Sequence, residues 1–299
     1  MTSQDLPVSL AQGRSLQRTV TSKTIFSNVM TGLVFACALL ALIPLVALLF
    51  YVITKGAPRL SLQLFTQLPP PPFPRDSPQF YSGGFGNAVL GTFMTVGIAS
   101  LMSIPFGIFA AIYLSEFARD TKLANAINFF TNVLSGVPSI IMGVFAYGLI
   151  VLTTRSYSAM AAGFALAVLM LPTIVRTSAE ALESVPNNLR QASTGLGASN
   201  YQTVLRVILP AATPAILTGI ILAIARAAGE TAPIIFTALF SNFWNLDPWG
   251  PTATLSVLVY NFAITPFANW QELAWAAALV LVSLVLMANI LARWVTRKR

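Results

Sequence analysis

Long apolar stretches alternate with short polar segments along the whole chain. Five windows contain no Asp, Glu, Lys or Arg, namely residues 24–54, 79–115, 123–154, 156–175 and 273–292. A sixth, residues 213–239, is interrupted only by Arg226 and Glu230. A helix of about 20 apolar residues crosses the hydrocarbon core of a membrane, and backbone groups in lipid must be satisfied within the segment. The pattern therefore predicts an all-α integral membrane protein with six transmembrane helices.

The same pattern sets the expected boundaries. We expect spans near residues 24–54, 86–115, 124–153, 157–178, 212–240 and 271–293, which together form one transmembrane domain over residues 24–299. Residues 1–23 are polar and are predicted to be a cytoplasmic tail. Residues 56–85 contain the sequence LPPPPFPRDSP, which cannot form a helix because proline lacks the backbone donor. This predicts a stiff external loop, or else a surface that touches an external partner.

Composition agrees with a membrane protein. Only 9% of residues are charged, against about 25% in soluble domains. The net charge of +8 is unevenly placed. With the N-terminus inside, the inner side holds Arg14, Arg18, Lys23, Arg119, Lys122, Arg176, Arg190, Arg206, Arg293, Arg297, Lys298 and Arg299, and the outer side holds Lys55, Arg59, Arg75 and Arg155. This asymmetry predicts that both termini are cytoplasmic, and it argues against a nucleic-acid partner.

Two residue types limit the chemistry. The chain has no histidine and a single cysteine, Cys37, so it lacks the commonest general base and cannot form an internal disulfide. An embedded hydrolase is therefore disfavoured. The first apolar run is too long for the core of a cleavable signal and follows a polar tail, which favours a retained anchor.

The polar stretch between the fourth and fifth spans, residues 176–206, predicts two short helices. Pro186 suits the first turn of a helix over residues 188–193. Gly195 and Gly197 can stop that helix, because glycine accepts a left-handed conformation. Ser199 or Asn200 can then cap a second helix.

The sequence QASTGLGASNYQTVLRVILP, from Gln191 to Pro210, resembles the cytoplasmic loop of permease subunits in binding-protein-dependent ABC importers. The family pattern is EAA, three residues, Gly, nine residues, then I-x-L-P. The matching positions are Gln191, Ala192, Ser193, Gly197, Val207, Leu209 and Pro210, with Gln191 and Ser193 departing from the pattern. The resemblance implies that residues 180–210, including the turn at Gly195, dock into a groove on a cytoplasmic ATPase. An ordinary interhelical loop is the alternative.

Arg226 and Glu230 are the two charges inside the fifth span. Arg226 lies thirteen residues from either end of the window 213–239, which on a straight helix places it near the membrane midplane. A charge there costs about 2.5–3.5 kcal/mol. The pair at i, i+4 either joins the helix to its neighbours, or lets Arg226 line a path for an anion, with Glu230 orienting it and Thr231 offering a hydroxyl.

The segments ILAIARAAGETAPIIFTALF and SAEALESVPNNLRQAS are similar to permease subunits of phosphate-specific ABC importers, the PstA type. That resemblance implies a type I importer permease (MetI-like) fold in a bacterial inner membrane. It also implies a sister permease, two copies of a cytoplasmic ATPase and an external phosphate-binding protein, with phosphate crossing by alternating access.

No phosphate-binding G-x-x-x-x-G-K-[ST] motif occurs in the chain, so ATP hydrolysis is expected in a separate ATPase that holds ATP and magnesium. We expect this chain to be no enzyme and to hold no cofactor or metal of its own. Two other functions stay open. One is a permease for another oxyanion, such as sulfate or molybdate. The other is a self-contained secondary anion carrier, which more often shows repeated halves than this sequence does.

Overall fold

A computed structural model of the chain describes residues 22–117 and 121–297. All regular secondary structure in these ranges is helical, which confirms the predicted all-α class. The chain divides into two units, residues 1–51 and 52–299. Apart from residues 22 and 23, the predicted cytoplasmic tail lies outside the described residues.

The helix α1, Ser22–Gly56, begins in the first unit and contains Pro44. The second unit carries the remaining elements. These are η1 (Ala57–Arg59), α2 (Gln63–Thr66), α3 (Gly86–Ile112), η2 (Tyr113–Phe117), α4 (Lys122–Gly136), α5 (Ser139–Ala146), η3 (Tyr147–Val151), α6 (Leu152–Thr154), α7 (Ala159–Glu183), α8 (Asn187–Gly195), α9 (Asn200–Thr203), η4 (Val204–Ile208), α10 (Leu209–Ala228), α11 (Ala232–Ile235), α12 (Leu255–Ala263) and α13 (Ala268–Arg297).

Five described helices are long and apolar enough to cross a membrane, or six if one bent pair counts as a single span. The bent pair is Lys122–Gly136 with Ser139–Thr154, which meet at 108°. The sequence predicted one continuous span over residues 124–153. Pro138 explains the break, because it lacks a backbone N–H and disfavours a helical conformation at Val137 before it.

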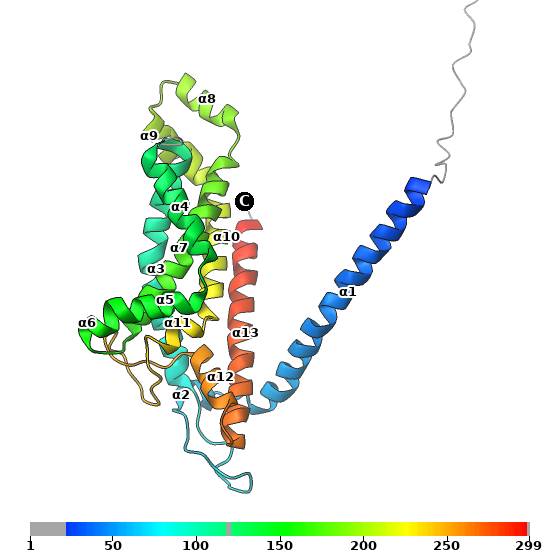
Figure 1. Ribbon diagram of the computed structural model, residues 1–299, viewed down its shortest axis with the longest axis vertical. Helices are drawn as coiled ribbons and strands as arrows, with labels where there is room; N and C mark the ends of the chain where they lie inside the picture. Colours follow the sequence, from blue (N-terminus) through cyan, green and yellow to red (C-terminus); the bar gives the residue numbers. More distant parts are fainter. Residues whose placement is uncertain (1–21, 118–120, 298–299) are drawn as a thin grey trace, which may run out of the picture. The chain divides into compact units, whose positions relative to one another are not determined.

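The core of the second unit forms around α7, which packs against α3 and α10 (Figure 1). Its buried side chains include Leu166, Met170 and Ile174. The helices come very close, since a Cβ built on Gly163 would lie 2.5 Å from a methyl of Ile98 on α3. Small residues permit such contacts between membrane helices, so the glycine fixes the distance between α3 and α7.

The predicted external loop is fixed to the start of α13 by hydrogen bonds to its prolines. The side-chain amide of Asn269 donates to the carbonyl of Pro71 at 2.9 Å, and the indole of Trp270 donates to that of Pro70 at 2.9 Å. Proline cannot donate, but its carbonyl still accepts. At Pro70 and Pro71 the loop is therefore held by hydrogen bonds that its backbone carbonyls accept.

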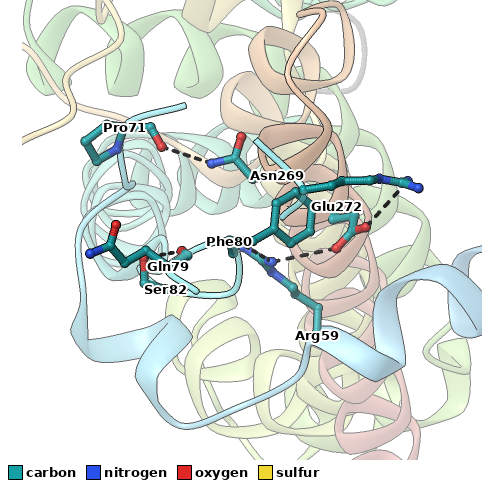
Figure 2. A network of polar contacts seen from close by, with 8 residues as sticks. Arg59, Pro71, Gln79, Phe80, Ser82, Asn269 and Glu272 are labelled. Carbon is teal, nitrogen blue, oxygen red and sulfur yellow. Dashed lines mark hydrogen bonds and ion pairs between the residues drawn. The ribbon is translucent and has the colours of Figure 1, made fainter. Parts of the chain in front are cut away.

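Arg59 holds the other side of this loop (Figure 2). Its buried Nη1 donates to the carbonyl of Phe80 at 2.9 Å and lies 3.7 Å from a carboxylate oxygen of Glu272 on α13. The guanidinium also lies 5.0 Å from the ring centroid of Tyr81. One cation thus joins the end of η1, the loop and α13. The loop, with α2 and α12, lies at the opposite end of the unit from α8 and α9 (Figure 1).

Candidate functional site

Arg226 lies in the last turn of α10 and not in the middle of a helix. The helix ends at Ala228, and the N–H groups of Gly229 and Glu230 bond back to the carbonyls of Arg226 and Ala227 at 3.1 and 3.2 Å. The sequence predicted a helix running on to residue 240. Gly229 weakens helix propagation and Pro233 begins a new helix at its second position, so the chain turns here.

The pair formed by Arg226 and Glu230 is open and loose. Arg226 Nε lies 3.8 Å from Glu230 Oε1, and the two side chains are 64% and 17% exposed. The backbone carbonyl of Glu230 accepts a 2.7 Å hydrogen bond from Ser256 on α12. A guanidinium that is mostly exposed and only loosely paired remains able to bind another anion, which favours the pathway hypothesis over a purely structural pair.

The Arg226 side chain lines a polar cavity of about 290 Å³. The cavity contains two arginines, one glutamate and four hydroxyl groups, and its lining residues are Leu134, Ser135, Val137, Ser139, Met142, Leu169, Pro172, Thr173, Arg176, Thr177, Glu180 and Arg226. Of the three residues predicted for the pathway, only Arg226 is among them. Glu230 and Thr231 lie next to it in the chain, at the turn before α11.

Arg176 on α7 is the site residue that sequence reasoning missed. Its Nη2 donates to Oδ1 of Asn132 on α4. In the sequence Arg176 counted only as an orienting charge, because it opens the polar stretch 176–206, whereas α7 continues through it to Glu183. A signal was present, since Arg176 and Glu180 repeat the i, i+4 spacing of Arg226 and Glu230 on a second helix.

A tight helix contact brings the two arginines to one cavity. A Cβ built on Gly219 of α10 would lie 2.2 Å from the hydroxyl oxygen of Thr177 on α7. Only glycine leaves room for this approach. Arg176 and Glu180 also line a neighbouring cavity of about 190 Å³ that reaches Glu183. Arg176 and Glu180 therefore line both cavities.

The chemistry of the cavity suits an oxyanion. Guanidinium groups stay protonated and offer planar pairs of donors that match oxyanion geometry. The hydroxyls of Ser139 and Thr173 add neutral donors. Glu180 adds a negative charge, which limits how tightly an anion is held.

The predicted helix–turn–helix between α7 and α10 is confirmed. The helix α8 follows Pro186 and contains Gln191, Ala192, Ser193 and Gly195. Gly197 has a left-handed φ of 84°, as its proposed role in the turn requires. Ser199 caps α9 in a capping box with Gln202.

The rest of the predicted motif continues directly into the membrane helix. Val207 lies in the π-helical segment η4, and Leu209 and Pro210 open α10. At the other end of the motif, the Ser193 and Thr203 hydroxyl oxygens are 2.9 Å apart, which joins α8 to α9. Leu196, at the turn, is 90% exposed.

Comparisons with known proteins agree with this architecture. Residues 103–299 match the family described as "Binding-protein-dependent transport system inner membrane component". A chain of a bacterial alginate ABC transporter, solved with an alginate-bound periplasmic protein, superimposes with a TM-score of 0.64 at 14% identity, over 92% of this chain and 96% of that one. A chain of the MetNI methionine ABC transporter gives 0.57 at 20% identity, over 71% and 92%. The fold is therefore that of the membrane permease of an ABC importer.

Curated relatives narrow the class. The phosphate transport system permease protein PstA of Haemophilus influenzae is 42% identical over 89% of this chain and 92% of its own length. PstA of Yersinia pestis is 41% identical over 88% of each chain, and PstA 1 of Mycobacterium tuberculosis is 35% identical over 93% and 92%. The chain belongs to the PstA family of inner-membrane permease subunits.

Proposed function

We propose that this chain is the membrane-spanning permease subunit of an ATP-driven phosphate importer. Together with a sister permease it forms the pathway for inorganic phosphate, which crosses by alternating access. The observation that carries the proposal is the cavity in which Arg176 and Arg226 meet four hydroxyl groups. The names of the relatives support phosphate as the cargo.

Arg226 is the proposed contact for phosphate at the end of α10, and Arg176 is the proposed second contact. Glu230 and Thr231 act beside Arg226, where the carboxylate orients the guanidinium and moderates its grip. A pathway must bind its ion strongly enough to admit it and weakly enough to release it. The carboxylates of Glu180 and Glu230 serve that second requirement by competing for the arginines.

The energy for transport comes from ATP hydrolysis by partner subunits in this proposal. Two copies of a cytoplasmic ATPase hold ATP and magnesium, and one of them docks on residues 180–210 of this chain. The segment suits docking because Leu196 and Tyr201 expose apolar surface beside the rigid turn at Gly197. In this proposal α8, α9 and both termini are cytoplasmic, and residues 24–299 form the permease domain.

An external phosphate-binding protein delivers the cargo at the opposite end. Tyr81 in the anchored loop and Phe243, Leu246 and Trp249 between α11 and α12 are exposed there. Large exposed aromatic side chains are typical of protein interfaces. The anchoring of the loop by Arg59 keeps part of this surface rigid.

The test is purification of the chain with its ATPase and sister permease, followed by uptake of labelled phosphate into vesicles. Uptake should require ATP and the binding protein, and excess sulfate should not compete. Competition by sulfate or molybdate would indicate that the transported ion is another oxyanion. Phosphate transport by this chain alone, driven by an ion gradient, would show that the protein is a secondary carrier and not a subunit of an ATP-driven importer.

A further inference from the structure

An ion pair outside the cavity lined by Arg176 and Arg226 joins the docking segment, residues 180–210, to the segment η2 that continues α3. Arg190 on α8 pairs through Nη1 with Oε2 of Glu116 in η2, the segment that continues α3. The two side chains are 18% and 6% exposed. Arg190 Nη2 also donates to the carbonyl of Leu182 in the last turn of α7 at 2.8 Å. One guanidinium on α8 therefore contacts both η2 and α7.

The helix α8 has few other attachments. None of its residues is buried, so it is not held by apolar packing. Among the described residues, its other side-chain hydrogen bond to a different helix is the one between Ser193 and Thr203 of α9. A force applied to α8 therefore reaches α3 through Arg190.

From α3 the movement has a direct route to the arginine cavity. A Cβ built on Gly107 of α3 would lie 2.6 Å from a methyl of Ile174 on α7, so the two helices have no free space between them. Ile174 is fully buried and is followed two residues later by Arg176 of the cavity. Close-packed interiors transmit displacement because they have low compressibility.

We propose that the ion pair of Glu116 and Arg190 is a coupling link, which carries the movement of α8 to α3 and so to the cavity. The inference rests on the proposed function, since it requires an ATPase that moves α8. A largely buried pair suits this role. Its members resist separation, because removing either partner leaves the other charge poorly solvated.

A purely stabilising pair makes a different prediction. If the pair contributes only to stability, removing both charges together restores the amount of folded protein, because no buried charge is left without a partner. If the pair is a coupling link, removing both charges restores the amount of folded protein but not the coupling between ATP hydrolysis and transport.

The experiment uses the full assembly in vesicles and measures phosphate transported per ATP hydrolysed. The variants are Glu116→Gln, Arg190→Gln, the double Glu116→Gln/Arg190→Gln, and Arg190→Lys, which keeps the charge. Lys122→Gln, an exposed charge at the same end of the unit, is the matched control. The amount of co-purified ATPase is measured for each.

We expect both single neutral variants and the double variant to lose about fivefold to tenfold in phosphate per ATP, within the range of measured coupling effects. ATPase co-purification should be unchanged in the double variant. Arg190→Lys and Lys122→Gln should stay within twofold of wild type.

Two results would overturn the coupling link. One is wild-type coupling in the double variant, which leaves only a stabilising role. The other is a loss in Arg190→Lys as large as in Arg190→Gln, which makes the charge irrelevant. A wild-type assembly that hydrolyses ATP without moving phosphate would instead refute the proposed function.

Discussion

Replacing Arg226 by glutamine tests the arginine cavity most directly. The change removes the positive charge and keeps a polar side chain of similar reach. Because Arg226 is 64% exposed and its nearest contact with Glu230 is 3.8 Å, the variant should fold and insert normally. Loosely paired exposed charges contribute only about 0.2–1 kcal/mol to stability. Any loss of transport then reflects the pathway and not the fold.

The expected loss can be worked out from the contacts that disappear. A hydrogen bond to a charged group contributes about 1.5–3 kcal/mol, and each 1.4 kcal/mol is tenfold in affinity. Phosphate uptake below saturation should therefore fall about 10- to 150-fold. The loss of uptake should lie toward the upper limit of this range. Glu230 would remain beside the passing anion without the positive charge of Arg226, and its carboxylate would repel the anion.

The assay is initial uptake of labelled phosphate in vesicles that hold equal amounts of the assembly. Arg226→Lys, which keeps the charge but not the planar donor pair, should retain more uptake than Arg226→Gln. Arg75→Gln, at an exposed arginine of the outer loop, should leave uptake within twofold of wild type. Uptake within twofold of wild type in Arg226→Gln would show that phosphate does not pass this side chain.

Three other substitutions test the fold and the docking segment. Arg59→Met should lower stability by about 1–3 kcal/mol, because the outer loop loses its buried donor, and should make residues 60–85 more sensitive to protease. Gly163→Leu should force α3 and α7 apart and lower the thermal midpoint in detergent, whereas Gly97→Leu, whose Cβ would point into open space, should not. Gly197→Ala should reduce ATPase co-purification, because its left-handed φ costs alanine about 1–2 kcal/mol, and Gly148→Ala, outside the docking segment and with open space at its Cβ, is the control.

Several features of the candidate site followed from short-range rules. Pro186, Gly197 and Ser199 specify the start, turn and restart of the helices around α8, since capping and left-handed turns depend on neighbouring residues alone. Gly229 follows the same rules, because it ends α10. There the apolar run beyond the glycine suggested a continuous helix to residue 240, whereas α10 ends twelve residues earlier, at Ala228.

The sequence by itself determined the all-α class, the apolar spans and the short helices around Gly197, and it singled out Arg226 as a candidate, because each depends on composition or on residues close together in the chain. Only the tertiary structure decided which distant groups meet. Arg176 joins Arg226 because Gly219 lets α10 approach Thr177 on α7, and Arg190 reaches Glu116 because α8 folds back toward the end of α3. Such pairings depend on helix packing across more than forty residues, since 226 − 176 = 50 and 190 − 116 = 74, and no local pattern encodes that.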